Sequence, residues 1–346
     1  MKQQLENLLR SAFELGASDI HLTVGVPPVM RINGELKKHG ETTLKPEDTE
    51  NMAKAIIPDS MWEKFKKQGE LDFSYGIPGV SRFRVNAYHQ RSCVGLAIRV
   101  IPRDIPTFEE LRLPAVFRDF ALLPQGLVLV TGPTGSGKST TLAAMIDEMN
   151  RTVKKHIITL EDPIEYLHKH GTCIINQREV GFDTGSFANA LRACLRQDPD
   201  VILVGEMRDL ETISTAITAA ETGHLVLATL HTTDAPTTID RIIDVFPPGQ
   251  QGQVRIQLAS ELKAIISQRL FRNQKSNGRI AAFEILINNP AVRNLIRNEK
   301  IHQIRSVMQT SKHIGMQTMQ MSVQSLLNQN LISLEDAKPY MTDGGY

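Results

Sequence analysis

The run at residues 132–139 (GPTGSGKS) constrains the fold of this chain more than any other feature of its sequence. It fits the pattern G-x-x-x-x-G-K-[ST] at every fixed position, and that pattern is typical of a phosphate-binding loop. The apolar residues 126–130 before it predict a buried strand, and residues 140–150 after it predict a helix. Because the motif requires this order of strand, turn and helix, we expect an α/β P-loop domain with a parallel sheet.

The residues of this loop suit a phosphate chain. Glycines let the backbone turn tightly, so that successive N–H groups and the start of the helix face an anion. We expect Lys138 to reach the β- and γ-phosphates and the Ser139 hydroxyl to bind Mg²⁺. The alternative is a chance loop rich in glycine and serine, and the flanking strand and helix argue against it. The candidate nucleotide-binding residues are Gly132, Pro133, Thr134, Gly135, Ser136, Gly137, Lys138, Ser139 and Thr140.

Size, charge and cysteine content narrow the class of protein. The chain has 346 residues, enough for two domains, and 41% of them are hydrophobic. The formal net charge of +1 gives no reason to expect nucleic acid or an anionic membrane surface as a partner. Cys93, Cys173 and Cys194 form no C-x-x-C pair, which favours reduced thiols over a disulfide framework or a zinc site. There is no signal sequence and no apolar run of about 18 residues, so we expect a cytoplasmic protein.

The pattern of residues along the chain predicts four parts. Short alternating stretches after one helix predict a small α+β domain at residues 1–100. The proline-containing stretch 101–107 (IPRDIPT) breaks regular structure, so we expect a linker and hinge at 101–112. Alternating strands and helices predict the parallel-sheet core at 113–289, and a mainly helical segment follows at 290–346.

One predicted strand of the core ends in a single carboxylate. Residues 200–206 (DVILVGE) form a short apolar stretch that ends at Glu206. At the carboxyl end of a parallel strand, Glu206 is placed to orient or deprotonate an attacking water or to hold the Mg²⁺ shell. The alternative is an exposed acid at the end of a strand.

Two further predicted strands end in polar side chains. Residues 157–165 (IITLEDPIE) end in Glu161, Asp162 and Glu165, which would concentrate negative charge where a divalent cation binds. Taken alone, this stretch fits a solvated loop equally well. Residues 225–233 (LVLATLHTT) place His231 at a strand end, where it is able to sense a phosphate, although a lone histidine is more often structural.

Together these segments resemble the Walker A, Asp, Walker B and His boxes of the secretion/type IV pilus ATPase superfamily, which implies a RecA-like core. The resemblance covers almost the whole chain, and within the superfamily it narrows to the PilT-type twitching-motility ATPases. Three stretches look like that family's PAS-like N-terminal domain, namely 17–22 (ASDIHL), 27–34 (PPVMRING) and 82–86 (RFRVN). Two more, 191–200 (LRACLRQDPD) and 238–247 (TIDRIIDVFP), look like its core.

One segment bears on whether the resemblance is to ATPases that retract pili or to those that extend them. Residues 291–300 (AVRNLIRNEK) resemble the A-I-R-N-L-I-R-E-x-K motif of retraction members, with Val292 in place of Ile and Asn298 in place of Glu. Without the family, the same residues predict an amphipathic basic helix with a solvated face. Gln320 also replaces the Asp usual in the family. Because assembly-type relatives carry a tetracysteine zinc motif and a long N-terminal extension, which this sequence lacks, the resemblance favours retraction over extension.

The resemblance also implies residue roles. Glu206 corresponds to the catalytic glutamate, Glu165 to the Asp-box acid that supports water or Mg²⁺, and His231 to the sensor. Arg84 and Arg99 match arginines that the family's N-terminal domain contributes to the nucleotide, where a guanidinium would neutralise the transferring phosphoryl group. Without the family, both would be read as charges on a strand surface.

The implied function is that of a homohexameric motor using ATP and Mg²⁺. It would rotate an inner-membrane pilus platform protein, retract type IV pili and drive twitching motility from the cytoplasmic face of the membrane. A paralogous pilus ATPase is a further implied partner. The alternatives within the superfamily are a PilU-like accessory ATPase, a retraction paralogue with another pilus partner, and a type II secretion or pilus assembly ATPase.

Three other classes of protein fit less well. A nucleic-acid motor should show a basic or aromatic strand-binding surface, yet aromatic residues make up only 5% of the chain, so we expect no nucleic acid partner. A GTPase needs a guanine-reading N-K-x-D sequence, and residues 273–276 (NQKS) do not fit it. A non-catalytic scaffold would be expected to have lost Lys138 or Glu206, and both are present.

Overall fold

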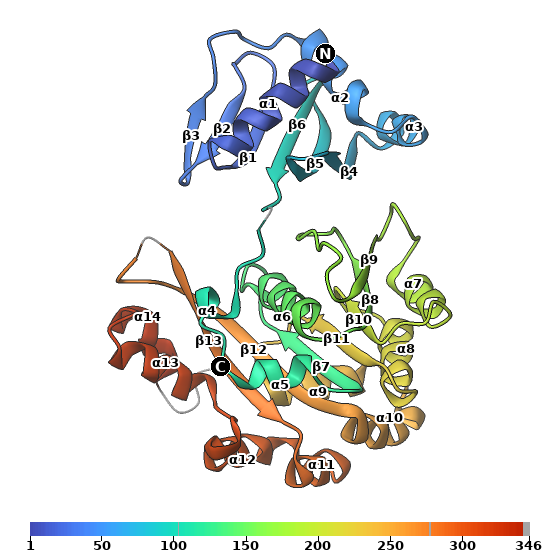
Figure 1. Cartoon of the computed structure of the whole chain (residues 1–346), viewed down its shortest axis with the longest axis vertical. Helices are drawn as coiled ribbons and strands as arrows, with labels where there is room; N and C mark the ends of the chain where they lie inside the picture. The colour runs from blue at the N-terminus through green and yellow to red at the C-terminus, as the bar shows by residue number, and fades with distance from the viewer. Residues whose placement is uncertain (103, 277, 342–346) are drawn as a thin grey trace. The chain divides into compact units, whose positions relative to one another are not determined.

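The computed structural model describes residues 1–102, 104–276 and 278–341. Residue 103 of the predicted linker, residue 277 of the predicted core and residues 342–346 of the predicted C-terminal segment lie outside this description. The described chain divides into two compact units (Figure 1). The first comprises Met1–Asp104 and Glu165–Leu167, and the second comprises Ile105–Ile164 and His168–Tyr346. The junction falls inside the range that we predict as a linker, and the hinge itself stays a prediction.

The first unit is an antiparallel sheet with helices, an α+β arrangement. Its strands lie in the order β3-β2-β1-β6-β5-β4. They are β1 (Ala17–Leu22), β2 (Val29–Ile32), β3 (Glu35–Lys38), β4 (Glu70–Ile77), β5 (Ser81–Gln90) and β6 (Cys93–Val100). The helices are α1 (Lys2–Glu14), α2 (Pro46–Ile56) and α3 (Asp59–Gln68). The edge strand β3 and the helices α2 and α3 were not expected from the sequence.

The core of the first unit lies on one face of this sheet. On β5, Phe83 and Val85 are fully buried, while Arg84 between them is only half-buried. Successive side chains of a strand point to opposite faces, so Arg84 lies on the face away from the core. On β6 the buried Ile98 precedes the exposed Arg99 in the same way. The alternation in the sequence therefore places the apolar side chains on the core face of the sheet and the two arginines on the other face.

The second unit contains the predicted α/β core. Its strands lie in the order β13-β12-β7-β11-β10-β8-β9. They are β7 (Gly126–Thr131), β8 (His156–Glu161), β9 (Ile174–Glu179), β10 (Val201–Val204), β11 (Leu225–Leu230), β12 (Leu262–Arg272) and β13 (Arg279–Ile287). All neighbouring pairs are parallel except β12 with β13. The predicted α/β class with a mostly parallel sheet is confirmed, while the antiparallel hairpin of β12 and β13 was not predicted.

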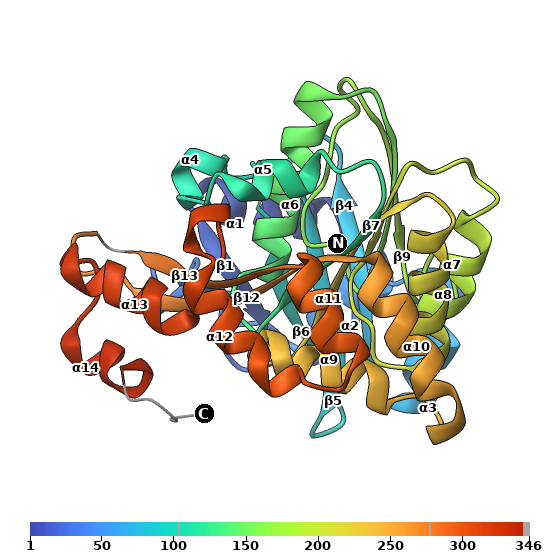
Figure 2. The same cartoon turned by 90° about the horizontal axis from the view of Figure 1, so that it is seen from below.

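Helices cover both faces of this sheet (Figure 2). On one face, α4 (Phe108–Leu111), α5 (Val116–Ala121) and α6 (Lys138–Thr152) pack through one apolar cluster. On the other face pack α7 (Phe187–Cys194), α8 (Leu210–Glu221), α9 (Ala235–Asp244), α10 (Pro248–Glu261), α11 (Pro290–Arg297) and α12 (Ile304–Thr310). The strands between them, such as β7 and β11, are buried along their whole length. A strand covered on both faces needs a continuous apolar sequence, which explains why these strands were recognised.

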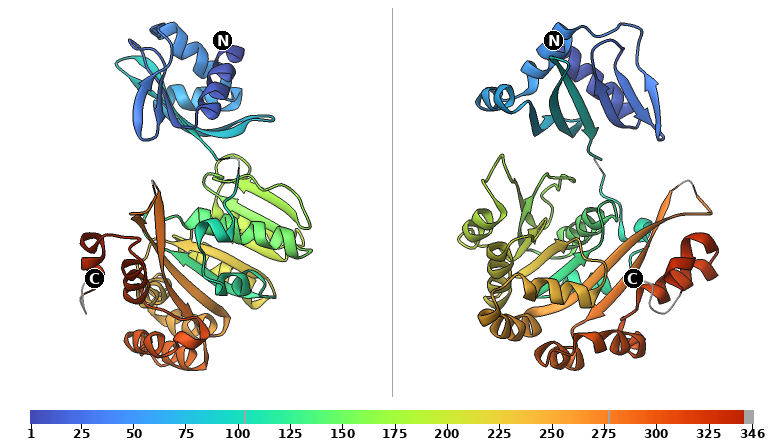
Figure 3. Two further views of the ribbon diagram at one scale, coloured as in Figure 1. Left: turned by 60° about the vertical axis from the view of Figure 1, so that its left-hand side comes forward. Right: turned by 180° about the vertical axis from the view of Figure 1, so that it is seen from behind.

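Residues 290–341 are mainly helical. After α11 and α12 come α13 (Met319–Asn328) and α14 (Leu334–Ala337), with short 3₁₀ turns at Ile301–Gln303, Lys312–Ile314 and Lys338–Tyr340. Figure 3 shows α13 and α14 beside the long hairpin of β12 and β13. They bury Met319 and Val323 against Phe271 and Ile280 of that hairpin. Among the residues that the structure describes, no helix combines the length and the apolar character needed to cross a bilayer.

Candidate nucleotide-binding and hydrolysis site

The phosphate-binding loop connects β7 to α6, as the motif predicts. Gly132, Gly135 and Gly137 have φ angles of 143°, 78° and 90°, which L side chains rarely adopt. Glycine tolerates these angles because it has no Cβ atom. The fixed glycines of the motif are therefore explained by the backbone turn between the strand and the helix.

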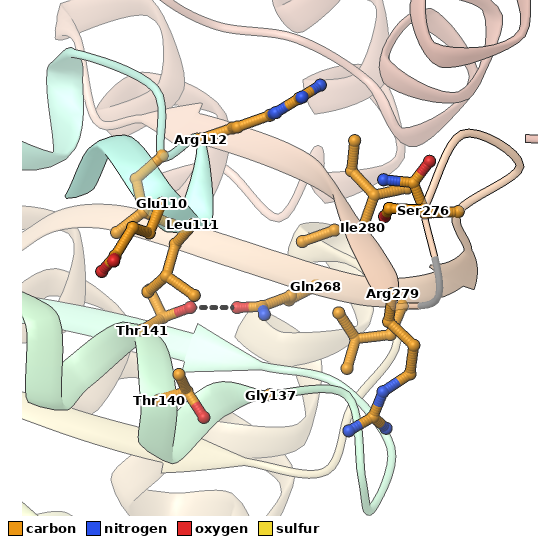
Figure 4. A pocket seen from close by; sticks show the side chains of 14 residues that line it. Glu110, Leu111, Arg112, Gly137, Thr140, Thr141, Gln268, Ser276, Arg279 and Ile280 are labelled. Carbon is orange, nitrogen blue, oxygen red and sulfur yellow. Dashed lines mark hydrogen bonds between the residues drawn. The ribbon is translucent and has the colours of Figure 1, made fainter. Parts of the chain in front are cut away.

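Two of these glycines also make room for a close approach to β12. A Cβ atom on Gly132 would lie 2.5 Å from the backbone oxygen of Gln268, and one on Gly137 would lie 2.8 Å from its Nε2 atom. Gln268 is buried, and its Oε1 atom accepts a hydrogen bond of 2.8 Å from Thr141 Oγ1 (Figure 4). The loop thus lies directly against β12, which fixes its shape.

The polar side chains of the loop are arranged around its own backbone. Lys138 Nζ donates hydrogen bonds to the carbonyl oxygens of Gly132 at 2.7 Å and Pro133 at 3.2 Å. Ser136 Oγ is buried and has no hydrogen-bond partner within the described part of the chain. A buried hydroxyl without a partner costs free energy, so its position in this loop fits an anion that would accept a hydrogen bond from it. The N-terminus of α6, which begins at Lys138, adds a positive dipole end.

Glu206 lies two residues beyond β10, where its predicted strand ends. Its Oε1 atom accepts a hydrogen bond from Arg208 Nε and lies 2.9 Å from His231 Nε2, within ion-pair distance. The hydrogen bond and the charge of Glu206 raise the pKa of Arg208 above its usual range. The structure therefore brings together two of the predicted residues, Glu206 and His231, and adds Arg208.

The close packing of β10 against β8 explains why the residue before Glu206 is a glycine, Gly205. A Cβ atom on Gly205 would lie 3.0 Å from the backbone oxygen of Leu160 and 3.3 Å from Cα of Glu161. Glu161 is the last residue of β8, and its Oε1 atom accepts hydrogen bonds from Thr159 Oγ1 at 2.6 Å and Gln177 Nε2 at 3.1 Å. The ends of these two strands therefore place the backbone of Glu161 and Glu206 close together.

Glu165 lies four residues beyond the end of β8. Its side chain is exposed, and it belongs to the short stretch Glu165–Leu167 that groups with the first compact unit. Of the acids in the predicted stretch 157–165, Glu161 is thus the one at the strand end. The supporting role of Glu165 stays a prediction.

Arg84 and Arg99 lie side by side on the sheet of the first unit. They are directly opposite each other on β5 and β6, and Arg99 is in turn opposite Asp19 on β1. Arg99 Nε donates a hydrogen bond of 3.0 Å to Asp19 Oδ1. Like charges directly opposite each other destabilise a sheet, so this pair fits a surface that meets an anion. Their action on the nucleotide stays a prediction.

A pocket next to the phosphate-binding loop has a volume of about 410 Å³. Cavities of this size are typical of small-molecule sites. The loop side is formed by Gly137, Thr140 and Thr141, and the opposite side by α4 and the hairpin of β12 and β13 (Figure 4). The remaining lining residues are Glu110, Leu111, Arg112, Leu113, Gln268, Leu270, Asn273, Ser276, Arg279, Ile280 and Ala281.

Sequence reasoning missed two residues of this site. Gln268 lies far along the chain from the loop that it contacts, and nothing in its local sequence marks it. Arg208 was closer to recognition, because it lies only two residues beyond Glu206 and is the first cation after it. Among the described residues there is no cluster of three or more His, Cys, Asp or Glu side chains that would hold a metal ion unaided.

Comparison with known proteins agrees with this site. The family model described as "Type II/IV secretion system protein" matches residues 1–337. The type IV pilus retraction ATPase PilT of Pseudomonas aeruginosa is 49% identical over 334 residues, covering 96% of this chain and 97% of that protein. The type IV pilus ATPase PilU of the same organism is 45% identical over 334 residues, covering 96% of this chain and 87% of that protein.

A solved structure extends the similarity to three dimensions. The crystal structure of the pilus retraction motor PilT with bound ADP has a TM-score of 0.91 and 53% sequence identity, covering 98% of this chain and 97% of that one. Identity at this level over the full length exceeds what a shared fold alone requires. The chain therefore belongs to the type II/IV secretion system protein family and, within it, to the PilT-type pilus retraction ATPases.

Proposed function

We propose that this protein is an ATP-hydrolysing motor that retracts type IV pili and so drives twitching motility. The observation that carries the proposal is the phosphate-binding loop, whose backbone, buried Ser136 hydroxyl and Lys138 ammonium are arranged to receive an anion. The full-length similarity to a pilus retraction ATPase supports the choice of motor.

ATP binds with its phosphates in the loop formed by residues 132–140. Lys138 exchanges its bonds to the Gly132 and Pro133 carbonyls for bonds to the β- and γ-phosphates, because a charged acceptor binds an ammonium more strongly than a neutral one does. The nucleoside occupies the pocket beside Thr140 and Thr141. Its mixed lining of apolar and polar side chains suits a base and a ribose.

The oxygen donors at this site fit Mg²⁺. The Ser139 hydroxyl at the start of α6 and the carboxylates that end β8 and follow β10 are hard ligands of the kind that this ion prefers. Magnesium usually keeps several waters and binds substrate phosphates, so the absence of an all-protein cage among the described residues suits it. Ser139 would hold the ion, which when bound neutralises charge on the phosphates.

Hydrolysis needs a group that activates water, and Glu206 supplies it. Its carboxylate orients the attacking water and takes its proton. His231, whose Nε2 atom lies 2.9 Å from Oε1 of Glu206, senses the γ-phosphate from the neighbouring strand. Arg208 donates a hydrogen bond to Glu206, so that the attacking water must compete with this ion pair for the carboxylate.

The first unit contributes the remaining groups. Arg84 and Arg99 neutralise the transferring phosphoryl group, for which planar guanidinium groups are well suited. Glu165 supports the water or the Mg²⁺ shell. The linker at 101–112 serves as the hinge, so that each cycle of binding and hydrolysis changes the angle between the two units.

The working assembly is a homohexamer at the cytoplasmic face of the inner membrane. Its partners are the pilus platform protein, which it rotates, and a paralogous pilus ATPase. The similarity to PilU supports one second candidate, an accessory retraction ATPase that acts together with a main motor.

Substitution of Lys138 by Ala tests the nucleotide site. The Ala variant loses charge-assisted hydrogen bonds worth about 1.5–3 kcal/mol, which corresponds to about a 10- to 100-fold weaker affinity for ATP. Binding of a fluorescent ATP analogue and phosphate release by the purified protein measure the effect. Lys155→Ala is the matched control, because Lys155 contacts Asp200 at 3.5 Å at the amino ends of the strands, whereas the loop follows the carboxyl end of β7. Unchanged ATP affinity in Lys138→Ala would show that the loop is not the phosphate site.

A further inference from the structure

Glu284 is a buried carboxylate on β13 that none of the roles above uses. Its side chain is 3% exposed. Its two oxygens accept hydrogen bonds from two different helices: Oε1 from the backbone N–H of Ala235 at 2.9 Å, and Oε2 from that of Met319 at 3.3 Å. Ala235 is the first residue of α9, and Met319 is the first residue of α13. One carboxylate therefore joins two helix N-termini.

Helix N-termini need such acceptors. The first four N–H groups of a helix have no partner inside it, and together they form the positive end of the helix dipole. Asp234 accepts from Thr237 and Thr318 accepts from Met321, which leaves the N–H groups of the first residues to Glu284. Because the bonds to both helices come from a single buried side chain, Glu284 fixes the two helix starts relative to each other.

The start of α9 is tied to the loop that carries His231. Ala235 follows His231 by only four residues. Thr232 Oγ1 and Thr238 Oγ1 are 2.7 Å apart, and Thr238 Oγ1 also donates to the backbone oxygen of Asp234 at 2.6 Å. These contacts fasten the loop to the first turn of α9. A shift of this turn would therefore move His231, whose Nε2 atom contacts Glu206 at 2.9 Å.

On its other side, Glu284 meets the C-terminal segment. Gln317 pairs through its backbone with Ile285 of β13, and Ser322 Oγ accepts a hydrogen bond of 3.0 Å from the Phe283 N–H. Burial raises the pKa of Glu284, and the bond from Ala235 acts in the opposite direction. The negative charge of Asp234 also raises this pKa, and the positive charge of Arg305 lowers it. Keeping a carboxylate in such a place costs free energy, which the bonds to both helices offset.

The same register row reaches the phosphate-binding loop. Glu284 is opposite Ser267 on β12, and Ser267 is opposite Thr131 on β7. The hydroxyl oxygens of Ser267 and Thr131 are 2.8 Å apart, and Thr131 directly precedes Gly132. A polar row therefore crosses three strands from the C-terminal segment to the start of the loop.

We propose that Glu284 is a positioning residue for ATP hydrolysis, which fixes the His231 loop relative to α13 of the C-terminal segment. The inference rests on the proposed function, and it adds a mechanical link between the C-terminal segment and the hydrolysis site. A displacement of the C-terminal segment reaches the hydrolysis site through this carboxylate.

Substitution of Glu284 by Gln tests the link in the full-length protein. The amide keeps the size of the side chain and one acceptor oxygen, but its NH₂ group faces the second N–H donor, so one helix start must move. Because a misplacement of about 1 Å can cost about 100-fold in rate, we expect kcat for ATP hydrolysis to fall by about 10- to 100-fold. The KM for ATP should change much less than kcat, because both hydrogen bonds of Glu284 go to helix starts outside residues 132–140.

Ser322→Ala is the matched control. It removes a buried hydrogen bond between α13 and β13 but leaves both bonds of Glu284 in place. We expect its kcat to equal that of the wild type. A folded Glu284→Gln variant with normal kcat, or an equal loss in Ser322→Ala, would overturn the inference.

A second pair of variants decides the matter if Glu284→Gln does not fold. Met319→Pro removes the N–H that donates to Glu284, and proline is tolerated at the first position of a helix. Met319→Ala removes the same side chain but keeps the N–H. We expect a lower kcat for Met319→Pro than for Met319→Ala, and equal values would overturn the inference. Wild-type protein that hydrolyses no ATP would instead overturn the proposed function itself.

Discussion

Glu206 and its two neighbours hold the chemistry that we propose at the scale of single residues. Its Oε1 atom accepts a hydrogen bond from Arg208 of its own loop and lies 2.9 Å from Nε2 of His231, at the end of the next strand. These contacts hold the acid in a defined orientation. This preorganisation distinguishes Glu206 from an ordinary exposed acid at the end of a strand.

Glu206→Gln should separate ATP binding from turnover. The amide keeps the size of the side chain but is unable to take a proton from water, so we expect hydrolysis to fall by about 10²- to 10⁴-fold. Affinity for ATP should remain, since the binding loop is unchanged. Phosphate release and equilibrium binding measure the two effects. Glu211→Gln is the control, because Glu211 is an acid on α8 that pairs with Arg192 at 2.5 Å. Normal hydrolysis by Glu206→Gln would remove Glu206 from the proposed role.

Arg84 and Arg99 offer a second test at this scale. If their guanidinium groups stabilise the transition state, Arg84→Ala and Arg99→Ala should each lower kcat strongly, by up to about 10³-fold or more in the manner of arginine fingers. Lys37→Ala on the edge strand β3 removes an exposed cation from the same sheet and should leave kcat unchanged. Steady-state hydrolysis by the purified proteins decides between them. If both arginine variants turn over ATP at the wild-type rate, the two arginines act only as surface charges.

At the scale of elements, one buried amide holds the junction of α10, β12 and β13. Asn288 Nδ2 donates to the backbone oxygens of Ala259 at 2.9 Å and Leu262 at 2.6 Å. These carbonyls belong to the last turn of α10 and the first residue of β12. The carbonyls at the end of a helix lack partners within it, so the amide caps α10 where the chain turns directly into a strand.

Asn288→Ala should therefore destabilise the fold. The substitution removes two buried hydrogen bonds to backbone carbonyls, each worth about 0.5–1.5 kcal/mol. A lower midpoint of urea or thermal unfolding would show this loss. Asn298→Ala is the control, because Asn298 is exposed and bonds only within its own helix end, so its change should stay within about 0.5 kcal/mol. Equal stability of the two variants would contradict the capping role of Asn288.

The elements show which parts of the fold a sequence reveals. The strands β7, β10 and β11 were predicted because they are continuous apolar runs. The edge strand β9 was missed, since its sequence IINQRE is largely polar. The strand β12 was also missed, because it follows α10 without glycine or proline, and a short apolar run does not distinguish helix from strand.

In the candidate site too, the residues that a local sequence pattern marks were the ones predicted. The phosphate-binding loop is contiguous, so its residues were recognised and their glycine requirement has a local cause. Gln268 and Glu284 act through contacts with segments far away in sequence, and no local pattern marks either of them. Arg208 was missed for another reason. An arginine after a carboxylate on a loop is common, and only the hydrogen bond to Glu206 shows that Arg208 belongs to the site.

At the scale of the whole molecule, the two compact units divide the proposed work. The second unit contains the loop, the pocket and Glu206, whereas Arg84 and Arg99 belong to the first unit. Separate units that each contribute to one reaction are suited to convert hydrolysis into movement. The family assignment rests on both units, since the similarity to PilT covers 96% of the chain.

The most direct test of this account is a count of surface pili and a measurement of twitching in a strain that lacks this protein. The strain is complemented with the wild type or with Glu206→Gln. The account predicts excess immobile pili in the deletion strain, normal pilus numbers and twitching with the wild type, and no rescue by Glu206→Gln. A deletion strain without pili would point to assembly instead, and one that retracts its pili normally would contradict the proposal of a main retraction motor.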